Sequence, residues 1–198
     1  MENKHTHLVP EELEQLERLS LTDKHMKLQK SLDAFLFCCY AGMRYSDFTN
    51  LSKKNIVDIN QETWLIYKSV KTGTEVRLPL YLLFAGKGIV ILNKYRNNLE
   101  DFFHLRDNSN INKDLIIIAK LAGLSKKISF HTARHTNATL LIYNGVNITT
   151  VQKLLGHKSV KTTQVYTNIM DMTIVHDLEK IKQAALGIKK KTDNSFNK

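Results

Sequence analysis

The sequence predicts an α+β fold that is mainly helical and carries a small three-stranded antiparallel sheet. Apolar residues recur at helical spacing through most of the 198 residues. Residues 56–80 break this pattern with three short runs rich in β-branched and aromatic residues, which favour strands. Glycines stand where helical patterns end, at Gly42, Gly145 and Gly156. No repeat or low-complexity linker divides the chain, so these elements are expected to form one domain.

Three helices are predicted before the sheet. The first begins at Pro10, which suits a first helical turn, and acidic residues follow it. Its apolar residues fall on one face, at Leu13, Leu16 and Leu19. The second helix covers about residues 25–41 and ends at Gly42; it is almost wholly apolar towards its C-terminal end. A short third helix restarts near Tyr45.

The sheet and the later helices follow in order. Strands are predicted at 56–60, 63–69 and 74–80, with QE in the first turn and Gly73 in the second. The sequence VKTG is then the exposed tip of a hairpin. Helices are predicted over residues 88–105, 112–123, 131–144, 148–155 and 172–186. Within them, the apolar run LIIIAKLAGL (115–124) predicts a buried helix, because it is too short to cross a bilayer.

The chain divides into a polar N-terminal tail (residues 1–7), one domain (8–187) and a basic tail (188–198) that is expected to be disordered. The N-terminus lacks the apolar stretch of a secretory signal, so a cytoplasmic protein is expected. Cys38 and Cys39 are adjacent within an apolar run, which predicts reduced core residues and no disulfide framework.

Positive charge is concentrated in the second part of the chain. The formal net charge is +10. Residues 1–119 hold 16 basic and 15 acidic side chains, a net +1, whereas residues 120–198 hold 13 and 4, a net +9. This distribution suits a polyanion such as DNA or RNA. A solubilising surface with a basic tail would give the same composition.

Two histidine-bearing segments lie in this basic part, HTARH and LLGHKSVKTTQVY. His131 and His135 of the first segment have the i, i+4 spacing of helical zinc sites. The intervening glutamate of H-E-x-x-H and a further ligand cluster are missing, so no metal is expected. His131 and Arg134 are spaced i, i+3 and are expected to share a helical face.

Four further residues attract attention by their positions. Arg44 stands between a helix stop and the next helix, whose N–H groups would reinforce an anion site. Lys71 lies in the hairpin tip, His157 follows a helix-ending glycine, and Tyr166 comes nine residues after His157. Each signal is weak alone, because an exposed lysine is usually only solvated and such an arginine commonly pairs with a carboxylate such as Asp47.

Together, two arginines, two histidines, a lysine and a tyrosine match the needs of phosphodiester transfer to a protein hydroxyl. Arginine forks can hold the non-bridging oxygens of a pentacoordinate transition state and stay charged at any working pH. A histidine can activate a tyrosine, whose phenol has a pKa of about 10. A lysine ammonium can protonate the departing 5′ oxygen, and no metal is required.

In order and spacing, H-x-x-R-H-T, then L-L-G-H, then V-Y-T resemble the catalytic domain of the tyrosine recombinase (phage integrase) family. AGMRYSDFTNL resembles its first-arginine segment, YKSVKTGTEVRLPL its lysine-bearing hairpin, and LVPEELEQL the start of the domain. The resemblance covers nearly all of residues 8–180. It implies a site-specific recombinase that cuts and rejoins DNA through a 3′-phosphotyrosyl intermediate, without a cofactor, to integrate or excise a mobile element.

The resemblance also implies a role for each matched residue. In the family, two arginines bind the phosphate, a lysine is the general acid, one histidine handles protons, another hydrogen-bonds the phosphate, and a tyrosine attacks. The matching positions are, in that order, Arg44 and Arg134, Lys71, His131, His157 and Tyr166. Asp47 would support the site indirectly. Lys71 is preferred to Lys68 as the acid, because it lies at a flexible tip and Lys68 within a strand.

Family members usually carry a separate N-terminal DNA-clamping domain, so an isolated catalytic domain of a longer protein is expected. Duplex DNA is the expected partner, with accessory DNA-bending proteins as further candidates. A tetramer on paired DNA sites is expected through the amphipathic helix near 172–186, although that helix could also pack within its own chain.

Two other functions remain open at this point. A type IB topoisomerase-like enzyme would share the chemistry and relax DNA without exchanging strands. A non-catalytic DNA-binding regulator would keep the fold, but DNA binding alone has no need for Tyr166.

Overall fold

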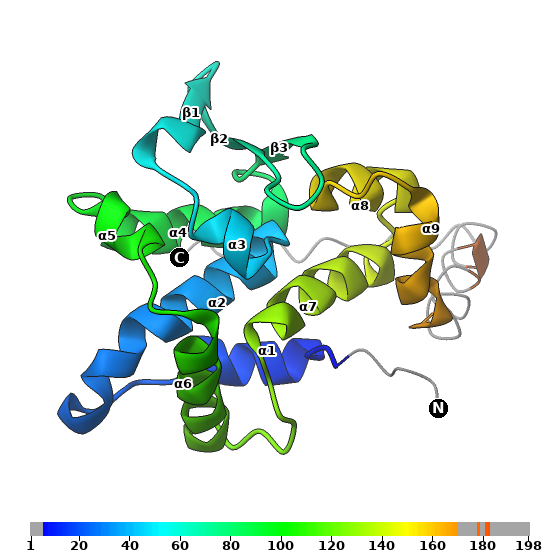
Figure 1. Cartoon of the computed structure of the whole chain (residues 1–198). Helices are drawn as coiled ribbons and strands as arrows, with labels where there is room; N and C mark the ends of the chain where they lie inside the picture. Colours follow the sequence, from blue (N-terminus) through cyan, green and yellow to red (C-terminus); the bar gives the residue numbers. More distant parts are fainter. Residues whose placement is uncertain (1–5, 170–177, 179–180, 183–198) are drawn as a thin grey trace, which may run out of the picture.

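Two long helices form the centre of the domain (Figure 1). The computed structural model describes residues 6–169, 178 and 181–182. Helices α2 (Gln29–Ala41) and α7 (Phe130–Tyr143) pack against each other although they are far apart in the sequence. Every residue from 31 to 41 is buried, and so is almost all of α7, because both helices are surrounded by other elements.

Shorter helices surround this central pair. They are α1 (Pro10–Glu17), α3 (Tyr45–Phe48), α4 (Lys87–Lys94), α5 (Leu99–Phe103), α6 (Asn108–Leu121), α8 (Ile148–Leu155) and α9 (Val160–Thr163). Their apolar faces join one core, in which aromatic rings from α2, α3, α5 and α7 meet edge to face or tilted.

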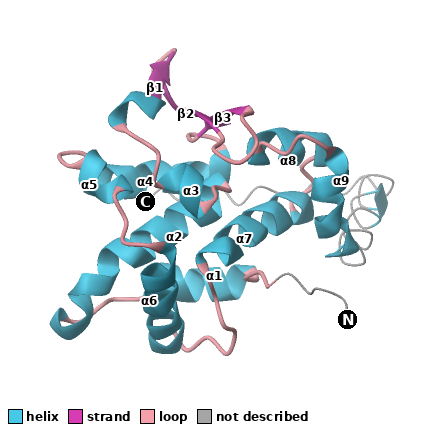
Figure 2. Ribbon diagram, in the orientation of Figure 1, coloured by secondary structure: helices cyan, strands magenta, loops and turns pink. Residues whose placement is uncertain are grey.

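The small sheet lies at one end of the molecule and is the magenta element of Figure 2. Its strands β1 (Ile56–Ile59), β2 (Glu62–Lys68) and β3 (Glu75–Pro79) pair antiparallel in the order β1-β2-β3. One face of β2 and β3 is buried, and there Leu65 stands opposite Leu78. The predicted α+β class with a three-stranded sheet is therefore confirmed.

Most predicted helices are present with small shifts of their ends. Residues 23–28 form a 3-10 turn ahead of α2, so the second helix begins later than its pattern predicted. The predicted helix at 88–105 is broken into α4 and α5, because the side chain of Asn98 accepts the Asp101 N–H and caps a new helix. The predicted helix at 172–186 lies outside the described residues, apart from Leu178 and residues 181–182.

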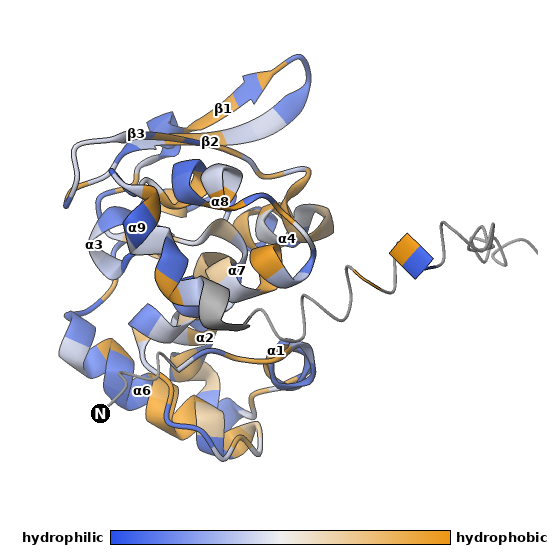
Figure 3. Ribbon diagram, turned by 90° about the vertical axis from the view of Figure 1, so that its right-hand side faces the viewer, coloured by the Kyte–Doolittle hydropathy of each residue, from blue (hydrophilic) through white to orange (hydrophobic). Residues whose placement is uncertain are grey.

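Two sequence predictions were wrong in part. The apolar run 115–124 buries Leu115 and Ile118, but Ile116 and Ile117 on the opposite side of α6 are 53% and 44% exposed. Only one face of α6 packs on the centre, and Figure 3 shows its hydrophobic residues beside hydrophilic ones. The Ser/Thr-rich segment after His157, for which no helix is predicted, folds into α9 and a following 3-10 helix, η4 (Gln164–Ile169).

The cysteine prediction is confirmed. Cys38 and Cys39 are buried free thiols on α2, and burial raises the pKa of both. Within the described part of the chain, no helix is both long enough and apolar enough to span a membrane.

A strained turn precedes α4, where Phe84 and Ala85 adopt left-handed backbone angles with φ of 48° and 53°. A Cβ atom disfavours this region, so we expect Ala85→Gly to raise the free energy of unfolding by about 1 kcal/mol. Urea unfolding measures the change. Ala122→Gly is the control, because Ala122 at the end of α6 has ordinary right-handed angles, so glycine there relieves no strain and should not raise stability. The same loss in the free energy of unfolding in both variants would contradict backbone strain at Ala85.

Candidate active site

A buried arginine lies at the centre of the candidate site. Arg134 on α7 is 1% exposed. Its Nη1 and Nη2 donate to the carbonyls of Gly42 and Leu155, each at 2.7 Å. These carbonyls lie at the C-terminal ends of α2 and α8, where the helix dipole is negative. Arg134 therefore joins three helices through one charged group.

Burial and the nearby Arg44 lower the pKa of Arg134 to about 10, which leaves it protonated at neutral pH. A guanidinium has five N–H donors. Because the two backbone carbonyls occupy two of them, others remain for a ligand. Arg134 can thus hold the fold together and still bind an anion.

The chain leaves α2 through a turn that only glycine fits. Gly42 has a φ of 67°, and a Cβ there would lie 2.6 Å from Oδ1 of Asn137 and 2.8 Å from Leu155 Cδ2. The Nδ2 of Asn137 donates to the carbonyls of Cys39 and Tyr40 at 2.9 and 3.0 Å. The end of α2 is therefore fixed against α7 one helical turn beyond Arg134.

Arg44 follows this turn as the residue that precedes α3. Its Nη1 lies 3.3 Å from Oγ of Ser69 and 3.4 Å from Oδ2 of Asp47, and its side chain is 14% exposed. The carboxylate of Asp47 is buried and also accepts the Val70 N–H at 2.8 Å. Asp47 thus contacts both the first arginine and the loop after β2.

Lys71 lies exposed in the turn between β2 and β3, as its sequence position predicted. Next to it, the hydroxyl of Thr72 donates to the Gly156 carbonyl at 3.1 Å. The hairpin tip therefore touches the end of α8, immediately before His157. The alternative lysine, Lys68, is the last residue of β2 and pairs with Glu75.

His157 follows this end of α8 and is buried. Its Nδ1 lies 2.9 Å from the Thr163 hydroxyl, and its carbonyl accepts from the Gln152 side chain at 3.1 Å. Burial lowers the pKa of His157 to about 4, with Arg134, Arg44 and Lys71 adding to the effect. The imidazole is therefore neutral at physiological pH, and the cations around it make the site strongly electropositive.

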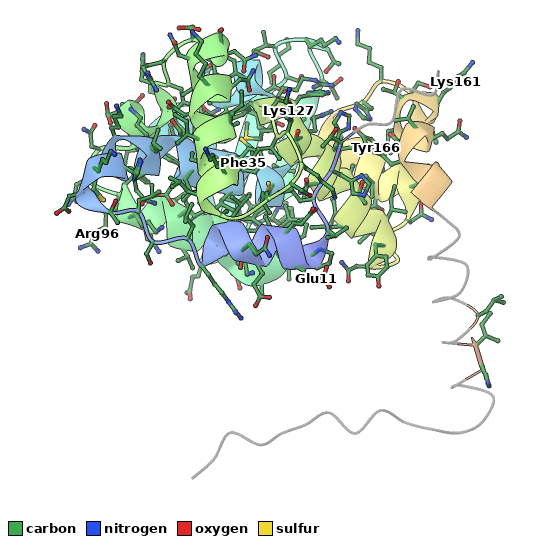
Figure 4. The ribbon with its side chains drawn as sticks, turned by 90° about the horizontal axis from the view of Figure 1, so that it is seen from below. Glu11, Phe35, Arg96, Lys127, Lys161 and Tyr166 are labelled. Atoms are coloured by element: carbon green, nitrogen blue, oxygen red, sulfur yellow. The ribbon has the colours of Figure 1, made fainter. Side chains whose placement is uncertain are left out.

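Tyr166 lies on η4 and is 4% exposed. In Figure 4 it lies against the body of the domain, whereas Lys161 lies at the outer edge. Burial raises the pKa of Tyr166, and the charges of Arg134 and Arg44 oppose that increase. The phenol is therefore protonated at neutral pH, in a place where two guanidinium groups would stabilise its anion.

One neighbour of Tyr166 was missed as a site residue. The ring of His135 lies 5.4 Å from the Tyr166 ring, and the exposed His131 packs edge to face on His135 at 4.4 Å. The two histidines thus form a stack that ends at the tyrosine. The i, i+4 spacing of His131 and His135 is the signal in the sequence that indicates this pair. Among the described residues, no group of three potential ligands is placed to hold a metal ion.

All six residues singled out from the sequence therefore gather around the ends of α2, α7 and α8. Arg44, Arg134 and Lys71 act electrostatically on His157, the two arginines act on Tyr166, and His131 approaches through His135. The six residues lie on or beside α3, the β2–β3 loop, α7, α8 and η4.

Comparison with known proteins shows the family of this chain. Residues 7–172 match the model of the phage integrase family, so the chain belongs to that family and the resemblance seen in its motifs is confirmed. A protein named tyrosine recombinase from Pseudothermotoga lettingae is 30% identical over 181 residues, covering 89% of this chain and 60% of the relative. The chain thus spans little more than half the length of that curated relative.

Solved structures confirm the fold. A XerA recombinase superposes with a TM-score of 0.68 at 24% identity, over 87% of this chain and 65% of that one. XerH, in a post-cleavage complex with a palindromic difH substrate, gives a TM-score of 0.64 at 21% identity, over 91% of this chain and 52% of that one. The tyrosine recombinase catalytic-domain fold expected from the sequence is therefore present.

The lowered pKa of His157 predicts a pH effect on stability. Between the ordinary value of 6.5 and about 4, the unfolded chain binds a proton at this position and the folded chain does not. His157 should therefore lower the free energy of unfolding as the pH falls through that window and have no such effect above it. Urea unfolding of His157→Gln should show a shallower decline between pH 6.5 and 4 than the wild type.

The exposed His104 provides the control, and His104→Gln should keep the wild-type slope. Identical slopes for His157→Gln and the wild type would contradict the buried, neutral state of His157.

Proposed function

We propose that this chain is a site-specific recombinase that cuts and rejoins DNA through a 3′-phosphotyrosyl intermediate at Tyr166. The observation that carries the proposal is the placement of a buried tyrosine within the field of two arginines, Arg44 and Arg134. A buried phenol on which two guanidinium groups act electrostatically suits attack on an anion that both arginines hold. The relatives named tyrosine recombinases support the same chemistry.

In the proposed cleavage step, the Tyr166 oxygen forms a bond to phosphorus while the bond from phosphorus to the 5′ oxygen breaks. The phenolic proton passes to the histidine stack of His135 and His131, and the Lys71 ammonium supplies a proton to the 5′ oxygen. Rejoining reverses these transfers, so no water or metal takes part in the balance. A neutral His157 can donate a hydrogen bond to a non-bridging oxygen.

Bound phosphate would also relieve a repulsion inside the protein. Arg44 lowers the pKa of Arg134, so the two positive charges oppose each other in the free site. The doubly coordinated phosphate places negative charge between them, and the transition state carries more of it. The arginines would therefore stabilise the transition state more than the bound ground state.

The distribution of charge supports duplex DNA as the substrate. Residues 115–169 contain no aspartate or glutamate and hold seven basic residues: Lys120, Lys126, Lys127, Arg134, Lys153, Lys158 and Lys161. All of these except Arg134 and Lys126 are exposed. Lysines in an acid-free stretch suit phosphate contacts along a duplex.

Assembly and biological setting complete the proposal. Leu178 and Ile181 in the C-terminal segment are 59% and 65% exposed, and burial of this apolar pair on a second copy would support a tetramer on paired sites. We propose integration or excision of a mobile element as the role, with action at the nucleoid and with DNA-bending proteins as accessory partners. The chain would then be the catalytic domain of a longer protein, as the length of its relative supports.

The nucleophile is tested with nicked duplexes that trap a covalent product on a denaturing gel. Wild-type protein should form a protease-sensitive adduct with DNA, and Tyr166→Phe should form none, because it lacks the attacking oxygen. Binding of DNA by Tyr166→Phe should be unchanged. Tyr143→Phe is the control and should keep the adduct. An adduct that persists in Tyr166→Phe would show that another residue attacks.

The electrostatic part of binding is tested by salt. For 6–10 phosphate contacts, affinity should fall by about 10³–10⁵ between roughly 50 and 200 mM salt. Lys158→Ala should lower the slope of log affinity against log salt by about 1, because one contact is lost. Lys24→Ala, an exposed lysine outside the basic stretch, should leave the slope unchanged. A wild-type slope near zero would rule out a phosphate-dominated interface.

A further inference from the structure

The loop that carries Lys71 is fastened on both sides of that residue. On one side, the Val70 N–H donates to Oδ1 of Asp47 at 2.8 Å. On the other, the Thr72 hydroxyl donates to the carbonyl of Gly156 at 3.1 Å. The two neighbours of Lys71 are therefore attached to different parts of the site, one beside Arg44 and one beside His157.

The loop is also closed on itself. The N–H of Ser69 donates to the Thr74 carbonyl at 2.9 Å, and the N–H of Gly73 donates to the Ser69 carbonyl at 2.8 Å. Gly73 has a φ of 68°, which lets the chain reverse there. The backbone around Lys71 thus has a defined conformation, which differs from the flexible tip that the sequence led us to expect. Only the exposed lysine side chain extends from it.

The corner at Gly156, whose carbonyl accepts from the Thr72 hydroxyl, is itself closely packed. Gly156 has a φ of 64°, and a Cβ there would lie 2.6 Å from Cγ2 of Val76 on β3. The end of α8 and the hairpin therefore meet without room for another atom. Because this corner leads directly into His157, a hydrogen bond to the Gly156 carbonyl ties the lysine loop to the position of that histidine.

We propose that Thr72 is a positioning residue for the general acid: its hydrogen bond to Gly156 holds Lys71 in place relative to His157 and the departing 5′ oxygen. This inference rests on the proposed recombinase function. The Asp47 contact alone would leave the loop attached on one side, and the lysine would reach the leaving group from a wider range of positions. Proton transfer depends steeply on such placement.

Loss of the Thr72 hydroxyl should therefore slow one step only. Thr72→Val removes the O–H and keeps nearly the same shape. Lys71 remains present, so we expect cleavage to slow by about tenfold, short of the ~10²–10⁴ that follows loss of a general acid. Affinity for DNA should be unchanged. Thr74→Val is the matched control, because Thr74 takes part in the same loop through its backbone atoms.

The readout that separates positioning from a structural effect is the leaving group. A nicked DNA substrate with sulfur in place of the bridging 5′ oxygen expels a thiolate, which needs little protonation. In single-turnover cleavage, Thr72→Val should be slow on the oxygen substrate and equal to the wild type on the sulfur substrate. Thr72→Ser, which keeps the hydroxyl, should cleave both substrates at the wild-type rate. In a Lys71→Ala background, Thr72→Val should have no further effect.

Four results would overturn the inference. Equal slowing of Thr72→Val on both substrates would mean that the residue acts on the fold or on phosphate binding, and an additive loss with Lys71→Ala would mean the same. A wild-type rate for Thr72→Val on the oxygen substrate would remove the positioning role while leaving the proposed function intact. Absence of any adduct with wild-type protein would overturn both together.

Discussion

The fold and the candidate site both depend on the two hydrogen bonds that buried Arg134 donates to backbone carbonyls. A charged group that is almost wholly removed from water costs several kcal/mol unless its donors are satisfied. Here the carbonyl ends of two helices satisfy two of them at 2.7 Å. The acceptors are Gly42, two residues before Arg44, and Leu155, two residues before His157. One side chain on α7 thereby sets the positions of two other members of the site.

Around this centre, the positive charges of the site exceed the negative ones. Asp47 is the buried carboxylate that offsets it, and its contacts to Arg44 and to the loop after β2 extend the same network towards Lys71. Burial and these cations together lower the pKa of His157 and leave it neutral, and the two arginines oppose the increase that burial gives to the pKa of Tyr166. A bound anion would supply the missing negative charge, so the site is organised for an anion before one binds.

Much of the fold could be predicted from the sequence because its signals are local. Gly42 and Gly156 marked two helix ends correctly, and the strands between residues 56 and 80 followed from their β-branched pattern. The misses concern tertiary context. Ile116 and Ile117 look like core residues, but no other element covers that side of α6 in the described part of the chain. The short helices after His157 have no hydrophobic period to reveal them.

The candidate site divides in the same way. Residue types and spacing indicated which side chains to consider, and they named all six that the structure brings together. They could not show that Arg134 is buried, that His135 stands against Tyr166, or that Thr72 joins the lysine loop to α8, because each fact depends on segments that meet only after folding. Asn137 is a further example, since its two bonds to the end of α2 fix a turn far away in the sequence.

The central claim is that this network presents Tyr166 to a phosphate as the attacking group. Mass spectrometry of the trapped DNA adduct tests it most directly, after digestion with nuclease and trypsin. Cleavage after Lys161 and Lys180 releases a peptide in which Tyr166 is the one tyrosine. The account predicts a nucleotide or phosphate attached to that peptide at Tyr166. A modification on a serine, or on the peptide that contains Tyr143, would contradict it.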